Sequence, residues 1–334
     1  MNNRAKRIGE SLGQLEQSKS GKLTVADVSR LVQMQREPSA SAYASSISAG
    51  QERVGIFRNQ ALVFVHDYNN TFEGAMQRAT QVSFDLQFGG VLIPFTWPSQ
   101  GTVSGYLTDG DMALKSVDAL VSFLDDAQMT MPDVKLHFLA HSMGNQLMLR
   151  TLCKIAKRKE DGPHNFGQVI AAHADVSEAD FEKLTMCFKE RVEGITLYVN
   201  EKDTALRLRC GGFQCRAGNK ARGYSAADVI DTTAMSRGFW RTLAKGFDHD
   251  VFVRNPLLFG DITRLLMVGQ RPVDQRTQEF RPKKDDKART YWTYDKSFDP
   301  AAQPIEDAEQ QVTMSAASIF QPVNRAGFAG GSRS

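Results

Sequence analysis

Residues 136–150, LHFLAHSMGNQLMLR, join an apolar run of strand length directly to a segment of helical character, and Ser142 stands at the junction. A serine on such a tight strand-to-helix turn has a strained backbone, which raises its hydroxyl above the sheet. Small residues two positions before and after the serine let the strand and the helix approach closely, and Ala140 and Gly144 occupy these positions. The stretch therefore predicts a nucleophile at Ser142, and a simple helix cap is the alternative explanation.

Similar apolar runs recur along the chain. Continuous runs of this length are typical of strands that helices cover on both faces, as in a parallel sheet. The runs are ALVFVH (61–66), VLIPFTW (91–97), VKLHFLA (134–140), QVIAAHA (168–174) and GITLYVN (194–200), with a fainter one at AADVID (226–231).

Segments with helical periodicity separate these runs. Thr108 with Asp111 fits a capping box that begins the second helix, and Ser177 with Asp180 suggests a cap for the fourth. Strands that alternate with helices predict a right-handed, mostly parallel α/β sheet with helices on both faces. The expected helices cover residues 75–86, 108–124, 143–155, 181–188 and 256–266.

Three regions of different composition divide the chain of 334 residues. Residues 1–57 are polar and rich in Ser and Ala, and we expect an N-terminal extension that is partly helical or flexible. Residues 58–269 carry all the apolar runs and form the expected domain, of a size that one hydrophobic core can support. Residues 270–334 are charged and contain Pro and Gly, so we expect an extended tail rather than a second domain.

Charge, hydropathy and cysteine content argue against several classes of protein. With 41 basic and 38 acidic side chains the formal charge is +3, which gives no large field for attracting nucleic acid. The chain shows neither an apolar run of membrane-spanning length nor a secretory signal, so we expect a cytoplasmic protein, with non-classical export left open. The four cysteines fit neither a disulfide scaffold nor a zinc site. Cys210 and Cys215 are expected to be reduced thiols, although an oxidising compartment would allow them to pair.

Two further stretches carry a resemblance to a known family. FVHDYNN (64–70) continues the first apolar run, and IPFTWPSQG (93–101) overlaps the second. Together with FLAHSMGN (138–145), they resemble the HGYN, FxWPS and AHSMG motifs of a mostly uncharacterised, esterase- and lipase-like branch of the α/β-hydrolase superfamily. The resemblance covers about residues 60–265 and implies the α/β-hydrolase fold, with a mostly parallel central sheet and terminal extensions.

The resemblance also implies an oxyanion hole made by the backbone N–H groups of Tyr68 and Met143. Each such donor stabilises a tetrahedral oxyanion by about 3 kcal/mol in other enzymes. Asp67 stands where the family has glycine. Aspartate tolerates a left-handed backbone better than most residues, but its carboxylate must face away from the hole, because it would otherwise repel the oxyanion.

A serine nucleophile needs a base, and the base needs an orienting acid. The chain order of the superfamily, Ser then acid then His, implies His249 as the base, because this histidine follows every core strand and precedes the last helix. Asp203 in EKDTAL resembles the acid-bearing D-x-A-L stretch of the family. Asp175, one strand earlier, is the alternative acid. The non-catalytic explanations are a surface-loop histidine for His249 and a helix N-cap for either aspartate, which fits Asp175 better.

These residues imply a serine hydrolase that cleaves a carboxylic ester or thioester through an acyl-enzyme on Ser142, with no metal and no cofactor. The expected substrate is a small-molecule or lipid-like ester, and residues 99–111, SQGTVSGYLTDGD, form a candidate rim or lid of the pocket. The alternative is a catalytically silent hydrolase-fold protein that serves as a binding or scaffold module. Protein partners would then contact the two tails.

Overall fold

The computed structural model describes residues 57–86, 88–158, 165–207, 215–235, 256–269 and 280–295, all within one compact unit that ends at Asp295. The strands are β1 (Gln60–Val65), β2 (Val91–Phe95), β3 (Lys135–His141), β4 (Phe166–Ala172), β5 (Gly194–Val199), β6 (Asp228–Asp231), β7 (Phe280–Lys284) and β8 (Thr290–Tyr294). In the described residues they form one sheet in the order β2-β1-β3-β4-β5-β6-β8-β7. All neighbouring strands are parallel except β7 and β8.

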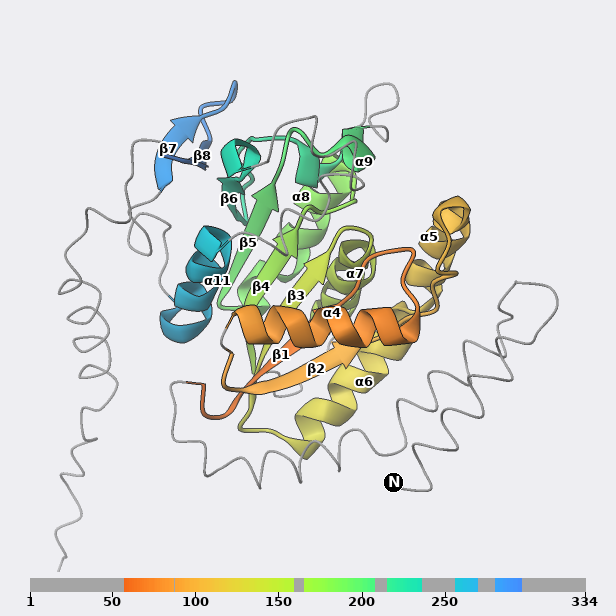
Figure 1. Cartoon of the computed structure of the whole chain (residues 1–334). Coiled ribbons are helices and arrows are strands. Elements are labelled where there is room, and N and C mark those ends of the chain that lie inside the picture. Colours follow the sequence, from red (N-terminus) through yellow and green to blue (C-terminus); the bar gives the residue numbers. More distant parts are fainter. Residues whose placement is uncertain are drawn as a thin grey trace, which may run out of the picture. The chain divides into compact units, whose positions relative to one another are not determined.

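Helices cover both faces of this sheet (Figure 1). One buried core lies between the sheet and α4 and α11, and a larger one lies on the opposite face with α5, α6, α7 and α8. None of the described helices is long and apolar enough to cross a membrane. The helices are α4 (Phe72–Asp85), α5 (Tyr106–Lys115), α6 (Val117–Thr130), α7 (Gly144–Ala156), α8 (Glu178–Phe188), α9 (Thr204–Arg207) and α11 (Pro256–Val268), with short 3-10 turns at Val103–Gly105, Lys189–Arg191, Ala217–Asn219 and Thr233–Met235.

The hydrophobic pattern of the chain accounts for most of these elements. Each of the six apolar runs overlaps a strand, and β4 and β5 are buried along their whole length. The spacing of Ala75, Ala79 and Val82 places all three on the buried face of α4. The predicted cap of α8 is confirmed, because the Ser177 side chain accepts a hydrogen bond from the Asp180 N–H at 3.1 Å. The predicted mostly parallel α/β sheet with helices on both faces is thus confirmed.

The second predicted helix is in fact two helices. α5 begins at Tyr106, after Gly105 and without a side-chain cap, so the capping box at Thr108 is wrong. The helix breaks at Ser116, whose hydroxyl donates to the Met112 carbonyl at 2.8 Å, and α6 follows at once. A serine that bonds back to its own helix offers the backbone an alternative to the next helical turn, which a pattern of apolar residues does not reveal.

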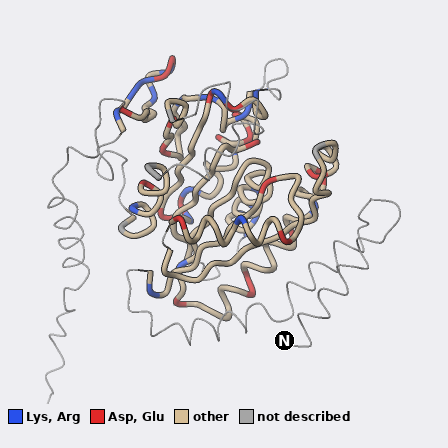
Figure 2. The backbone as a smooth tube through the Cα atoms, viewed as in Figure 1, with Lys and Arg blue, Asp and Glu red and all other residues tan. Residues whose placement is uncertain are grey.

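Two strands lie within the region expected to be a tail. β8 pairs with β6 at Ile230 and Trp292, and the Phe280 and Trp292 side chains are buried against the core on the α11 face. β7 forms the sheet edge, and Figure 2 shows Lys and Arg along this hairpin. Charged residues are common on edge strands, where they prevent pairing with other chains. Because β7 is rich in charged residues, it does not form an apolar run, and the pattern of apolar runs does not reveal the hairpin. The boundaries of the two extensions stay predictions.

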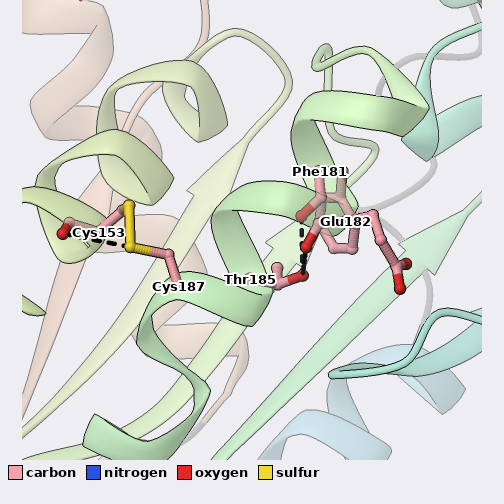
Figure 3. The surroundings of a disulfide bond; sticks show 5 residues. All are labelled: Cys153, Phe181, Glu182, Thr185 and Cys187. Carbon is pink, nitrogen blue, oxygen red and sulfur yellow. Dashed lines mark hydrogen bonds between the residues drawn. A yellow bond between two sulfur atoms is a disulfide. The ribbon is translucent and has the colours of Figure 1, made fainter.

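A disulfide joins the two helices that follow β3 and β4. Cys153 of α7 and Cys187 of α8, which are 34 positions apart in the sequence, are bonded (Figure 3). This pair was not considered from the sequence, so the bond is one that the sequence analysis missed. The pair considered from the sequence included Cys210, which lies outside the described residues.

Removing this disulfide tests its contribution to stability. We expect the double variant Cys153→Ser, Cys187→Ser to lose about 3 to 4 kcal/mol of unfolding free energy, because the bond restricts a long loop of the unfolded chain. Urea unfolding of oxidised protein measures the loss, and Cys215→Ser is the control. Equal stability of all three proteins would contradict the bond, as would the absence of a linked Cys153–Cys187 peptide in non-reducing mass spectrometry.

Candidate active site

The predicted site residues that the structure describes lie at one edge of the sheet. Tyr68 follows β1, Ser142 follows β3, Asp175 follows β4 and Asp203 follows β5. The carboxyl ends of parallel strands share one edge, which is where open α/β sheets bind their ligands. His249 lies outside the described residues, so its place at this edge stays a prediction.

Ser142 occupies a left-handed turn between β3 and α7. Its φ is +49°, and its side chain is buried. The Ser142 N–H donates to the Ala172 carbonyl at 2.9 Å, and the Ser142 carbonyl accepts from the Asp175 N–H at 3.1 Å. The buried Asn145 side chain donates to the carbonyls of Ala140, Ser142 and Ala172 at 3.1, 3.1 and 3.2 Å. The predicted strained turn is present, and hydrogen bonds from both sides hold it.

Gly144 allows α7 to begin against the end of β1. A Cβ at this position would lie 2.4 Å from the His66 carbonyl oxygen and 2.7 Å from that of Val65, so no side chain fits. The close approach predicted for a small residue here is confirmed. It also brings Met143, the N-cap of α7, next to the turn that follows β1. Backbone N–H groups at a helix N-terminus favour negative charge.

His66 fastens the turn after β1 to the end of β2. The Trp97 N–H donates to His66 Nε2 at 3.1 Å, and the Trp97 indole donates to the His66 carbonyl at 3.0 Å. The two rings stack with centroids 5.0 Å apart. Because Nε2 accepts a hydrogen bond, the proton is assigned to Nδ1, which lies 2.7 Å from the Asp67 carbonyl oxygen. Burial lowers the pKa of His66, against the raising effect of its bond to Asp67.

The Asp67 carboxylate has partners on both oxygens. Oδ2 lies 3.2 Å from Nδ1 of His141, and Oδ1 accepts a hydrogen bond from the Asn70 side chain. These contacts explain how a charged residue is tolerated where the similar family has glycine. The carboxylate is bound within its own turn and to the end of β3.

Asp203 is buried beside a histidine that the sequence analysis did not assign to the site. Its Oδ2 lies 3.6 Å from Nδ1 of His173, and both side chains are fully buried. Its Oδ1 accepts from the Leu206 N–H at 3.1 Å, as an N-cap of α9 does. His173 has a φ of +44°, and its ring centroid lies 5.9 Å from that of His141. Two features point to a role for His173, its left-handed backbone and its place just after β4, and neither corresponds to a sequence motif.

Asp175, the alternative acid, is held by two residues distant in sequence. Its Oδ1 lies 3.0 Å from the Arg216 Nε, and its Oδ2 accepts a hydrogen bond from the Tyr106 hydroxyl. The N-cap of α8 is Ser177. The cap explanation therefore fits Asp203, and it is wrong for Asp175. Among the described residues, no group of three or more His, Cys, Asp or Glu side chains is arranged to hold a metal ion.

The left-handed turn at Ser142 has a measurable consequence. We expect Ser142→Gly to be more stable than Ser142→Ala by about 1 kcal/mol, because glycine adopts a positive φ without a steric penalty. Urea unfolding of both variants gives the difference. An alanine variant as stable as the glycine variant would show that residue 142 does not need this backbone.

The buried, neutral His66 predicts a loss of stability in acid. Because its pKa in the folded protein is below 6.5, the unfolded chain binds the extra proton first as the pH falls. The unfolding free energy therefore rises with pH up to about 6.5, with a slope of at most about 1.4 kcal/mol per pH unit from this residue. Urea unfolding of wild type and His66→Gln at several pH values isolates the contribution. Identical slopes for the two proteins would contradict a neutral His66.

Two sequence comparisons show which known proteins this chain resembles. Residues 52–217, just under half of the chain, match the family described as "Alpha/beta hydrolase of unknown function (DUF900)". An uncharacterized protein of Nostoc sp. strain PCC 7120 is 35% identical over 60 residues, which are 18% of this chain and 16% of that protein.

A solved structure, of a lipase-esterase related protein from Clostridium acetobutylicum ATCC 824, overlaps with a TM-score of 0.25 at 16% identity. The overlap covers 38% of this chain and 49% of that one. In both comparisons the chain spans less than two thirds of the other protein's length. The parallel sheet covered on both faces, the turn at Ser142 and the family match together show that this chain has an α/β-hydrolase fold.

Proposed function

We propose that this protein is a serine hydrolase that cleaves a carboxylic ester or thioester through an acyl-enzyme on Ser142. The observation that carries the proposal is the positive φ of Ser142 at the junction of β3 and α7. A strained serine at the carboxyl edge of a parallel sheet is the arrangement in which hydrolases of this fold present their nucleophile. A serine that merely capped α7 would not need a left-handed backbone.

The proposed base is His249, and the proposed orienting acid is Asp203. The base takes the hydroxyl proton as Ser142 Oγ attacks the acyl carbon, and it returns the proton to the leaving alcohol or thiol. Water then attacks the acyl-enzyme with the same help and releases the acid. The position of Asp203 after β5 supports this assignment, since its carboxylate is at the same edge as Ser142. The Asp203 carboxylate also lies 3.6 Å from Nδ1 of His173.

The proposed oxyanion donors are the backbone N–H groups of Tyr68 and Met143. Gly144 supports their proximity, because it brings the start of α7 against the residues that precede Tyr68. The bonds from Asp67 to His141 and Asn70 support a carboxylate that is held away from the oxyanion. Under this proposal no metal or cofactor takes part in the reaction.

The substrate and the compartment are also part of the proposal. We expect a small-molecule or lipid-like ester, as for the esterase-like proteins that the sequence resembles. The Cys153–Cys187 disulfide favours an oxidising compartment over the cytoplasm expected from the sequence, because disulfides are rare in cytosolic proteins.

A fluorophosphonate probe tests the nucleophile and its partners. We expect wild type to be labelled and Ser142→Ala to be unlabelled, since the probe reacts with an activated serine hydroxyl. His249→Ala and Asp203→Asn should slow labelling by about 10³-fold or more, because the base and its orienting acid act as a unit. The readout is the labelling rate measured by mass spectrometry, with Ser225→Ala, an exposed serine before β6, as the matched control.

The outcome also separates the two candidate functions. A folded wild type that is not labelled, and that hydrolyses no p-nitrophenyl ester of any chain length, would favour the catalytically silent binding protein. If Asp203→Asn is labelled at the wild-type rate and Asp175→Asn is not labelled, then Asp175 rather than Asp203 is the orienting acid.

A further inference from the structure

The buried carboxylate of Asp109 has no place in the proposed triad, yet it binds two loops at the edge of the candidate site. Asp109 lies in the first turn of α5 and is fully buried. Its Oδ2 accepts from the Asn69 N–H at 3.1 Å and from the Ser99 hydroxyl at 2.6 Å. Its Oδ1 accepts from the Gln100 N–H at 2.8 Å. Three hydrogen bonds to one carboxylate form a strong contact between α5 and the loops after β1 and β2.

These bonds restrain the backbone on the carboxyl side of Tyr68. The Asn69 N–H is bound directly by Asp109, and the Asn70 N–H donates to the Ser99 hydroxyl at 3.1 Å. Asn69 also has a left-handed backbone, with a φ of +58°. The chain therefore turns sharply at Asn69, and Asp109 holds the amide at the centre of this turn.

His66 restrains the other side of Tyr68 through its bonds with Trp97. The peptide that bears the Tyr68 N–H thus lies between two anchored residues. Because a peptide unit is planar, its orientation follows from the few dihedral angles that connect it to these anchors. If the contact of Asp109 with Asn69 or the contacts of His66 with Trp97 were lost, the Tyr68 N–H could rotate away from the orientation it has in the structure.

We propose that Asp109 is a positioning residue that aims the Tyr68 N–H at the developing oxyanion. This inference rests on the proposed serine hydrolase function, and it adds a residue that the triad and the oxyanion donors do not include. Asp109 does not touch the reacting atoms in this scheme. It acts through Asn69, Ser99 and Gln100.

The first turn of α5 also contacts the side chain of Tyr68. The Tyr106 ring packs edge-on against the Tyr68 ring, with centroids 5.4 Å apart, and the Tyr106 hydroxyl binds Asp175. Residues three apart share one face of a helix, so Tyr106 and Asp109 anchor the same face of α5. α5 therefore connects the turn after β1, the loop after β2 and the loop after β4.

The chemistry of the three donors explains why a carboxylate is needed. Two backbone N–H groups and one hydroxyl all point at acceptor oxygens, and an amide would present an N–H₂ group to at least one of them. Asp109→Asn keeps the size of the side chain while leaving a buried donor without its acceptor. The variant therefore perturbs the turn with little change in packing.

Steady-state kinetics with a p-nitrophenyl ester test this inference on the full-length protein. For Asp109→Asn we expect kcat to fall by about 10- to 100-fold while KM changes by less than about threefold, because an oxyanion donor acts mainly in the transition state. The affinity for a trifluoromethyl ketone should fall by a similar factor, since its serine adduct carries an oxyanion. A purely structural defect would instead lower the amount of active enzyme and leave this affinity unchanged.

The matched control is Asp133→Asn, an exposed carboxylate in the turn before β3, away from the carboxyl edge of the sheet, which should behave as wild type. If Asp109→Asn does not fold, Ser99→Ala removes one of the three bonds and should show the same pattern with a smaller loss, about 3- to 10-fold in kcat. Wild-type kcat in these variants, or a raised KM with unchanged kcat, would overturn the positioning role. A wild type inactive toward both the ester and the fluorophosphonate would instead refute the proposed hydrolase itself.

Discussion

The left-handed backbone of Ser142 is the constraint on which the rest of the site depends. A positive φ at a residue with a side chain costs about 1 to 2 kcal/mol, so it persists only where the surroundings impose it. Here β4 bonds to the serine from one side, the buried Asn145 bonds to it from the other, and Gly144 lets α7 begin without a clash. Contacts from both the sheet and α7 therefore impose the positive φ of Ser142.

Several buried polar groups lie at the carboxyl edge of strands β1, β3, β4 and β5. Asp67 with His141, and the fully buried Asp203 with His173, form two carboxylate–imidazole contacts at the ends of β1, β3, β4 and β5. A buried carboxylate without polar partners would be strongly unfavourable, so polar groups from several elements surround it. Asp109 plays the same part between α5 and the loops. These polar contacts orient the turns, while the two apolar cores hold the strands.

Much of the fold was predictable because it follows from local patterns. Continuous apolar runs became the strands β1 to β6, and the spacing of apolar residues located α4, α7, α8 and α11. The failures share one cause. The break at Ser116 depends on a side chain that bonds to its own helix, β7 and β8 depend on pairing with β6, and the Cys153–Cys187 bond depends on how α7 packs against α8.

By itself, the sequence determined the order of most strands and helices, and it placed Ser142, Tyr68 and Asp203 in turns that follow strands. Hydrophobic periodicity and small residues act over a few neighbouring positions, so these features can be read locally. Only the tertiary structure decided which polar side chains meet. The pairing of Asp203 with His173, of Asp175 with Arg216, and of Asp109 with both loops joins residues from different strands and helices. Such contacts depend on the register and packing of whole elements, and no local pattern encodes them.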